Sequence, residues 1–128
     1  MTDRRAVLLA DADPLHREGW RQVIDAQPDL VVTGEVPDGV QLLAHLRRNP
    51  VDVVVADVRM PRLGGVQALR QARADAVVRL TQRATDLRTV LVAATDLDRH
   101  GPDGLAAGAD AVLWKGVEPE ALLAAIRG

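Results

Sequence analysis

The chain has 128 residues, 48% hydrophobic and 27% charged, a balance that indicates one folded domain and excludes a disordered chain. The formal charge of −2 and an aromatic content of two tryptophans argue against a nucleic-acid interface, and no apolar run is long enough for a membrane span or a signal peptide. The absence of cysteine excludes disulfides and thiolate chemistry and fits a protein of the reducing cytoplasm.

Short apolar runs alternate with amphipathic segments in the first half of the chain. The runs 6–10, 30–33 and 51–56 are largely apolar, which predicts strands buried on both faces of a sheet. The segment 14–26 and the segment that starts at Val40 carry apolar residues at helical spacing instead. Pro14 suits the first turn of the first predicted helix, and Asn49-Pro50 ends the second.

The second half of the chain continues the alternation after a loop rich in Pro and Gly at 60–65. We predict one helix from near Val66 to about Thr85 and a strand over 89–94. The next helix is expected to be short, around 105–107, because Gly101-Pro102 interrupts the segment before it. A strand over 109–114 follows, and the last helix is predicted to begin at Pro119.

Five strand–helix pairs without an internal repeat predict an α/β fold. Strands buried on both faces and joined by helical crossovers form a parallel sheet that is covered on each side. We therefore expect a five-stranded, doubly wound (βα)5 domain of the flavodoxin-like type, occupying residues 1–128 as a single unit.

Polar residues follow the predicted strands at the edge where such folds bind ligands. Asp11 and Asp13 follow the first strand, Asp57 ends the third, Thr95 follows the fourth and Lys115 follows the fifth. Two carboxylates ~4 Å apart repel by ~4 kcal/mol at an effective dielectric near 20, so a divalent cation or an ammonium must offset them. Oxygen ligands favour Mg²⁺, and a metal, a hydroxyl and a lysine beside a carboxylate are suited to phosphoryl transfer.

Each of these residues also has a purely structural interpretation. Asp57 is a common turn residue, Lys115 could be a solvated lysine at a strand end, and Thr95 is a suitable helix N-cap. For Asp13, which precedes Pro14, the N-cap interpretation is the preferred one. The chain has no glycine-rich phosphate loop of the nucleotide-binding kinds.

Three segments carry a resemblance to a known family. Residues 7–19 include Asp11 and the run Pro-Leu-x-Arg-Glu-Gly, residues 57–61 read Asp-Val-Arg-Met-Pro, and residues 107–115 begin Ala-Gly-Ala and end in Lys115. These segments resemble receiver domains of bacterial two-component response regulators. The first is similar in particular to the NarL/LuxR class of transcription factors, and the resemblance extends over nearly the whole chain.

The resemblance implies that a sensor histidine kinase or a small phosphodonor phosphorylates Asp57 with Mg²⁺ bound nearby. It implies that Asp11 and Asp57 are metal ligands with Asp13 as a weaker third candidate, that Lys115 pairs with the phosphoryl group, and that a hydroxyl such as that of Thr95 moves toward it. The domain would be a phosphoacceptor in the cytoplasm and not a classical enzyme. Phosphorylation would change homodimerisation or an output surface, and DNA would be bound only through an output domain that this chain lacks.

Four positions depart from the family pattern. Ala12 stands where a second acidic residue is usual, and Val112 stands where an aromatic switch residue is usual. The expected hydroxyl position falls on Ala94 or Thr95, and the stretch between Gly65 and Thr89 is longer than usual, which suggests a lengthened helix or an added loop.

These departures keep two alternatives open. One is an atypical receiver that a protein or small ligand regulates without phosphorylation. The presence of Ala12 in place of an acidic residue favours this alternative. The other is a flavodoxin-like enzyme, such as a phosphatase or a cofactor-binding protein. The enzyme is the weaker alternative because a phosphate loop and a pair of nucleophile and base are missing.

Overall fold

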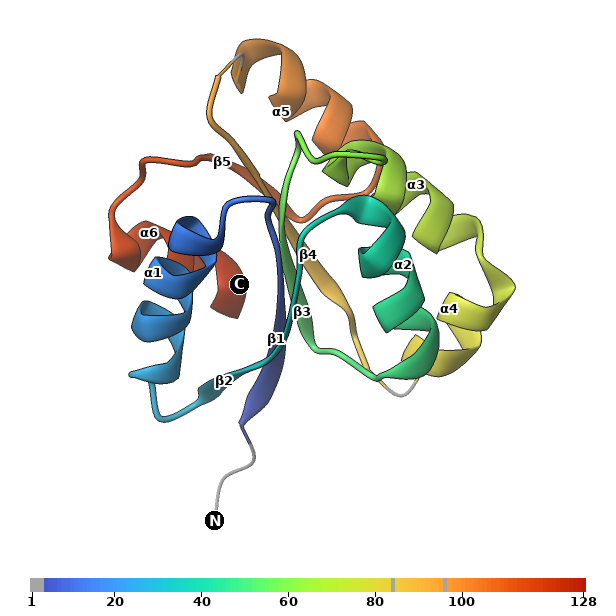
Figure 1. Ribbon diagram of the computed structural model, residues 1–128, viewed down its shortest axis with the longest axis horizontal. Coiled ribbons are helices and arrows are strands. Elements are labelled where there is room, and N and C mark those ends of the chain that lie inside the picture. Colours follow the sequence, from blue (N-terminus) through green and yellow to red (C-terminus); the bar gives the residue numbers. More distant parts are fainter. Residues whose placement is uncertain (1–3, 84, 96) are drawn as a thin grey trace.

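A computed structural model describes residues 4–83, 85–95 and 97–128, with the backbone alone at residues 97 and 98. Five parallel strands form one sheet in the order β2-β1-β3-β4-β5 (Figure 1). The strands are β1 (Arg5–Ala10), β2 (Leu30–Val36), β3 (Val53–Asp57), β4 (Arg88–Ala93) and β5 (Ala111–Trp114). The predicted doubly wound parallel sheet is confirmed.

Within the described residues, six helices cover the two faces of the sheet. They are α1 (Pro14–Asp25), α2 (Gly39–Arg48), α3 (Gly65–Ala74), α4 (Ala76–Gln82), α5 (Leu97–Ala106) and α6 (Pro119–Arg127). Helices α1 and α6 lie on one face and α2 to α5 on the other (Figure 1). None of the helices in the described residues is long and apolar enough to cross a membrane.

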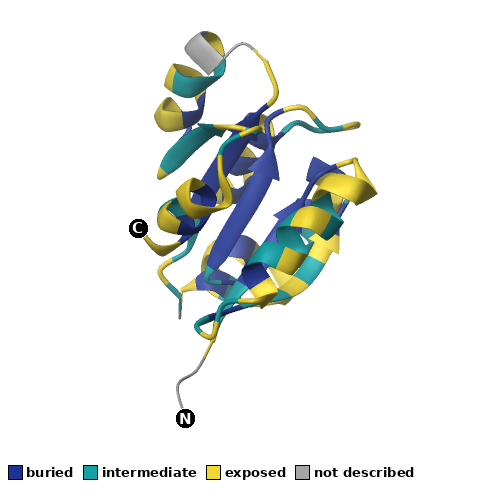
Figure 2. Cartoon of the chain, turned by 90° about the vertical axis from the view of Figure 1, so that its left-hand side faces the viewer, coloured by how far each residue is buried: buried dark blue, intermediate teal, exposed yellow. Residues whose placement is uncertain are grey.

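The central strands separate two apolar clusters by simple alternation of side chains. Leu8 of β1 and Val54 of β3 face α2 to α5, while their neighbours Leu9 and Val55 face α1 and α6. Alternate residues of a strand point to opposite faces, so a continuous apolar run supplies both clusters. Figure 2 shows the resulting buried central layer with exposed outer helix faces.

The second strand is longer than the predicted 30–33, because it continues through Gly34 to Val36. Its pairing with β1 shifts register, since Val7 lies opposite Val32 and Leu8 lies opposite Gly34, which leaves one extra residue in β2. Gly34 follows the extra residue, and a Cβ on Gly34 would lie 2.6 Å from a ring carbon of His45, so a larger residue there would force the His45 side chain to move.

The single helix predicted from Val66 to Thr85 is wrong, because the segment forms two helices. Asp75 ends α3 in an extended conformation and caps α4, where its side chain accepts a hydrogen bond of 3.0 Å from the backbone N–H of Val78. Asp75 also pairs with Arg47 of α2 at 2.5 Å. A short acceptor side chain competes with helix continuation in this way, and the residues after Asp75 form the separate helix α4.

The short helix predicted around 105–107 is also wrong, because α5 begins at Leu97 and contains Pro102. Proline removes one backbone donor from a helix, but this helix is held by tertiary packing as well. Gly104 lies against the sheet so closely that a Cβ would be 2.7 Å from the Val112 side chain and 3.0 Å from Leu91. The packing of this face outweighs the local cost of Pro102.

The buried side chain of Gln82 connects α4 by hydrogen bonds to the end of α2 and to the segment before β3. The amide nitrogen donates to the carbonyl oxygens of Leu46 at 2.9 Å and Asn49 at 2.6 Å, and the amide oxygen accepts from the N–H of Val51 at 2.9 Å. One side chain therefore completes the backbone hydrogen bonding between the end of α2 and the start of β3.

Replacing Gln82 with alanine is expected to lower the free energy of unfolding by about 2–4 kcal/mol, because three buried backbone groups lose their partner. Urea unfolding followed by circular dichroism measures the loss. The matched control is Gln71→Ala on the exposed face of α3, for which a change within about 0.5 kcal/mol is expected. Equal stabilities of the two variants would contradict the assigned role of Gln82.

Candidate functional site

A largely buried lysine joins two carboxylates at the carboxyl ends of the strands. Asp11 follows β1, Asp57 ends β3 and Lys115 follows β5. The Nζ atom of Lys115 lies 2.7 Å from Oδ2 of Asp11 and 2.6 Å from Oδ2 of Asp57. The three side chains are only 10%, 2% and 9% exposed for Lys115, Asp11 and Asp57 respectively. The structure thus brings together three of the five residues singled out in the sequence.

The environment of Lys115 stabilises its charged form. Burial by itself would lower the pKa of Lys115, but the contacts with Asp11 and Asp57 outweigh burial and raise the pKa above its ordinary value. The ammonium also lies 5.8 Å from the centre of the Trp20 ring, within range of a cation–π interaction. Lys115 therefore carries its charge throughout the neutral range.

Backbone geometry after β3 fixes the orientation of Asp57. Its Oδ1 atom accepts a hydrogen bond of 2.9 Å from the N–H of Arg59, which leaves Oδ2 turned toward Lys115. The loop then closes through a hydrogen bond of 3.1 Å from the N–H of Gly65 to the carbonyl oxygen of Val58. A Cβ at Gly65 would overlap the carbonyl oxygen of Asp57, so α3 can start this close to the site only with glycine.

Gly65→Ala is expected to lower the free energy of unfolding by about 1–3 kcal/mol, because the added methyl group forces the backbone of Asp57 to shift. Thermal unfolding and the amide signal of Arg59 in NMR spectra measure the two effects. The control is Gly19→Ala in α1, where nothing lies within 4 Å of the new methyl group. Alanine there is expected to raise stability by about 0.5–1 kcal/mol, and a similar gain at Gly65 would refute the steric argument.

The turn after β1 uses its two aspartates differently. The Oδ1 atom of Asp11 accepts from the N–H of Asp13 at 2.8 Å, and the guanidinium of Arg17 donates to the carbonyl oxygen of Asp11. The side chain of Asp13 accepts from the N–H of Leu15 at 2.9 Å and lies 3.1 Å from the ring of His16. The Leu15 hydrogen bond lowers the pKa of Asp13. The predicted N-cap role of Asp13 is confirmed.

The oxygen atoms at this site meet only part of the ligand requirement of a hard divalent cation. Asp11 and Asp57 supply anionic oxygens, and with Lys115 they leave a net charge of −1 in a site that is about nine-tenths buried. Mg²⁺ prefers such oxygen ligands. The third carboxylate is missing, since Ala12 has none and Asp13 is half-exposed at the helix cap. Across the described parts of the chain, no group of three or more His, Cys, Asp or Glu is placed to hold a metal.

The remaining residues of interest lie around this cluster. Thr95 and Ala94 are exposed in the loop after β4, and no hydrogen bond between described residues joins the Thr95 hydroxyl to Asp57 or Lys115. Val112 lies in β5 and packs against α5. Trp20 was not predicted at the site, because its spacing in α1 indicated only an apolar helix face. No sequence signal places it beside a lysine 95 positions away.

Comparisons with known proteins agree with this geometry. The profile of the response regulator receiver domain family matches residues 7–127. The chain is 36% identical over 125 residues to the uncharacterized transcriptional regulatory protein YxjL of Bacillus subtilis, covering 98% of the chain and 54% of that protein. It is 30% identical over 120 residues to the nitrate/nitrite response regulator protein NarL of Escherichia coli K12, covering 94% and 52% respectively. The chain therefore spans about half the length of these curated relatives.

Solved structures show the same fold. The receiver domain of a sensor histidine kinase from Pseudomonas aeruginosa superposes with a TM-score of 0.79 at 23% identity, covering 97% of this chain and 95% of that one. That crystal structure has a magnesium ion coordinated in its active-site cleft.

Proposed function

The chain belongs to the response regulator receiver domain family of two-component systems, with NarL-type transcription regulators among its relatives, and we propose that it is a signalling switch that accepts a phosphoryl group on Asp57. The observation that carries the proposal is the buried contact of 2.6 Å between Asp57 and Lys115 at the carboxyl edge of the sheet. A carboxylate held in this way presents an oriented oxygen nucleophile beside a fixed positive charge.

The residues of the site have distinct roles in this proposal. An oxygen of Asp57 forms a bond to phosphorus while the bond from phosphorus to the donor's leaving group breaks, and the leaving group takes up a proton. Lys115 then pairs with a phosphoryl oxygen. The first hydroxyl group after the end of β4 is that of the exposed Thr95. In this proposal it moves in to donate to another phosphoryl oxygen.

Asp11 and Asp57 would hold Mg²⁺, which when bound neutralises charge on the transferring group. We infer that this binding is weak, because Mg²⁺ affinity depends on the number and placement of anionic ligands. The third ligand is missing at Ala12, and Asp13 is engaged by Leu15 and His16. The same observation favours a second candidate function, an atypical receiver that a partner or ligand regulates without phosphorylation.

The proposal extends to the partners of the domain. A sensor histidine kinase would be the phosphodonor, as is typical of the family, and residues 1–128 would form one receiver domain. By analogy with the transcriptional regulators among its relatives, the switch would act on transcription through a DNA-binding output domain and through homodimerisation. The cytoplasm is the expected site of action.

Intact-mass spectrometry after incubation with acetyl phosphate and Mg²⁺ tests the proposal. We expect a gain of about 80 Da, the mass of one phosphoryl group, which is absent from an Asp57→Asn control treated in parallel. An ordinary receiver labelled in the same experiment verifies the conditions. If that receiver is labelled and this protein is not, phosphorylation is refuted and the phosphate-independent receiver is favoured.

A further inference from the structure

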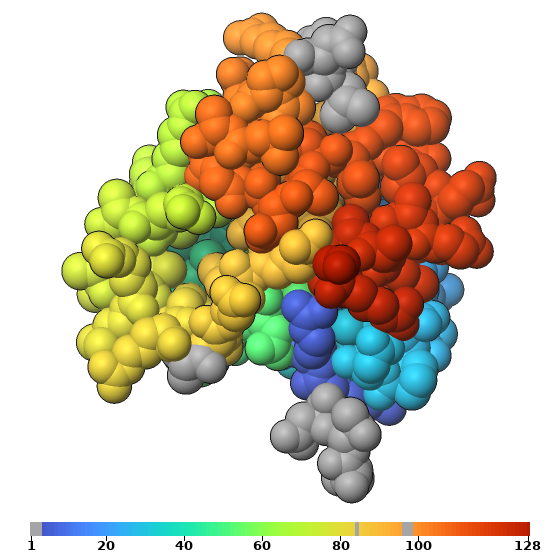
Figure 3. All heavy atoms as spheres, turned by 180° about the vertical axis from the view of Figure 1, so that it is seen from behind, coloured from blue at the N-terminus to red at the C-terminus, as the bar shows by residue number. Residues whose placement is uncertain are grey.

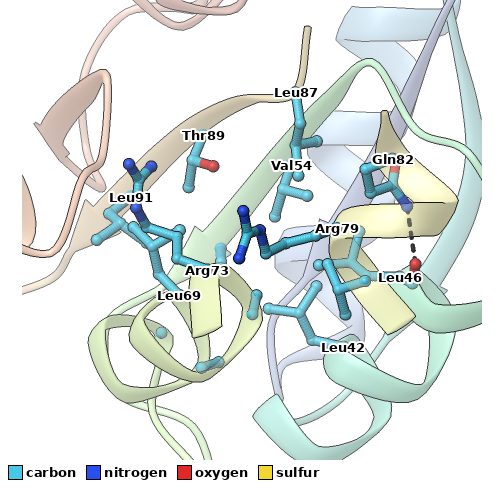
Figure 4. A pocket seen from close by; sticks show the side chains of 15 residues that line it. Leu42, Leu46, Val54, Leu69, Arg73, Arg79, Gln82, Leu87, Thr89 and Leu91 are labelled. Atoms are coloured by element: carbon cyan, nitrogen blue, oxygen red, sulfur yellow. Dashed lines mark hydrogen bonds between the residues drawn. The ribbon is translucent and has the colours of Figure 1, made fainter. Parts of the chain in front are cut away.

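A second potential binding site lies away from the Asp57 edge, in a cavity between the sheet and helices α2, α3 and α4. Its volume is about 390 Å³, within the range of small-molecule sites. Aliphatic side chains form most of its wall (Figure 4), among them Leu42, Leu46, Val54, Leu69 and Leu91. Figure 3 shows the surface hollowed between the α3–α4 region and the β4–α5 region.

The break between α3 and α4 explains why this space is not filled. On α3 the residues that face the cavity include Ala68 and Ala72, which offer only methyl groups. Helix α4 turns away at Asp75 and is fixed at its far end by Gln82, so it cannot collapse onto the sheet. The cavity thus results from the position of α4, which is fixed at both of its ends.

Two buried polar side chains lie in the wall, and one of them, Gln82, is already hydrogen-bonded to backbone groups. Thr89 of β4 is only 5% exposed, and its backbone N–H donates to the Asp110 carboxylate at 2.8 Å. Its hydroxyl has no hydrogen-bond partner among the described residues, and in Figure 4 the hydroxyl oxygen is turned toward the cavity. A hydroxyl in the wall of an apolar cavity can donate a hydrogen bond to a polar group of a ligand that enters the cavity.

Two positive charges border the same cavity. The exposed side chains of Arg73, in α3, and Arg79, in α4, are among the lining residues. No ion pair or hydrogen bond of either guanidinium occurs among the described residues. In the view of Figure 4 the Thr89 hydroxyl lies between the two guanidinium groups. Cations without partners beside an apolar chamber are complementary to a ligand with an anionic head and an apolar body.

We propose that this cavity binds a small amphipathic carboxylate, such as a medium-chain fatty acid. The carboxylate accepts hydrogen bonds from the guanidinium groups of Arg73 and Arg79 and from the hydroxyl of Thr89. The aliphatic chain occupies the space between the leucines of α2 and α3. The site is separate from Asp57, so its occupancy does not depend on phosphorylation.

Isothermal titration and amide NMR spectra of the protein with decanoate test the proposal. Decanol has the same chain without the charge, and acetate has the charge without the chain. We expect decanoate to bind with shifts centred on α3, α4 and β4, decanol to bind at least about tenfold more weakly, and acetate not to bind. Equal binding of decanoate and decanol, or shifts spread over the whole surface, would overturn the assignment.

Three variants locate the ligand within the cavity. Arg79→Gln and Thr89→Val are each expected to weaken decanoate binding by about fivefold or more, because each removes a donor to the carboxylate. Ala72→Leu fills the chamber and is expected to abolish binding. The control is Arg70→Gln, an exposed arginine of α3 that does not line the cavity.

The variants also separate binding from folding. Arg79 is exposed, so Arg79→Gln is expected to leave the unfolding temperature unchanged. If Arg79→Gln and Arg70→Gln weaken binding equally, decanoate is responding to the general charge of the surface, and the proposed site is refuted. The same conclusion follows if a folded Ala72→Leu variant binds as well as the parent.

Discussion

Lys115→Met is expected to lower the free energy of unfolding by about 2–4 kcal/mol, because it leaves two buried carboxylates without their shared cation. Asp11 and Asp57 each contact the ammonium at less than 3 Å in the native protein. Methionine preserves most of the apolar volume of the lysine stem, so the loss reports mainly on charge. Urea unfolding at neutral pH and low salt measures it.

A second substitution and a metal titration identify the cause of that loss. Asp57→Asn in the Lys115→Met background removes one of the two negative charges that repel each other. It is expected to restore about half of the lost stability. Mg²⁺ is expected to restore stability in the single variant by replacing the missing cation. If neither change restores stability, repulsion between the carboxylates is not the cause.

The pH dependence of this contribution has a definite sign. The pKa of Lys115 is raised in the folded protein, so its stabilising contribution is fully present below the ordinary lysine value of 10.5. The contribution is lost only as the pH rises through the raised value. Between pH 6 and pH 9 the difference in stability between the native protein and Lys115→Met is therefore expected to stay constant as far as Lys115 is concerned.

Ala12→Asp is expected to tighten Mg²⁺ binding by about tenfold or more, because it adds a third carboxylate beside Asp11 and Asp57. Ala12 is exposed, so the longer side chain meets no packing obstacle. Faster phosphorylation of Asp57 by acetyl phosphate is expected to accompany the tighter binding. Isothermal titration with Mg²⁺ and the time course of mass labelling measure the two effects.

Ala12→Asn is the matched control for this substitution, because it has the same shape without the negative charge. We expect it to change Mg²⁺ affinity far less than the aspartate does. Asp13→Ala provides a further comparison and is expected to cost about 1 kcal/mol of stability through loss of the helix cap, with little effect on Mg²⁺. A large loss of Mg²⁺ binding in Asp13→Ala would show that Asp13 is a ligand after all.

The parts of the fold that the sequence predicted well have strong local signals. Continuous apolar runs identified all five strands, and Pro14 and Pro119 marked the starts of α1 and α6. The two errors among the helices have a common origin, since local residues were weighed without their tertiary contacts. Asp75 ended a helix through its cap and its pairing with Arg47, whereas Pro102 did not end one because Gly104 packs tightly on the sheet.

The site shows the same division between local and distant information. Strand ends located Asp11, Asp57 and Lys115, because the carboxyl ends of parallel strands meet at one edge. The approach of Trp20 to Lys115 and the cavity beside Thr89 depend on helix placement, which local periodicity does not specify. These features became visible only when distant segments were brought together.

The bulge in β2 has a consequence for how copies of this domain can associate. The strands β2 and β5 form the two edges of the sheet. An exposed flat edge can pair with a strand of another chain. The extra residue at Thr33 interrupts the regular geometry of the first edge, and the second edge is only four residues long. Both borders of the sheet are therefore protected against strand addition and amyloid-like stacking, and any homodimer is expected to form through helical faces.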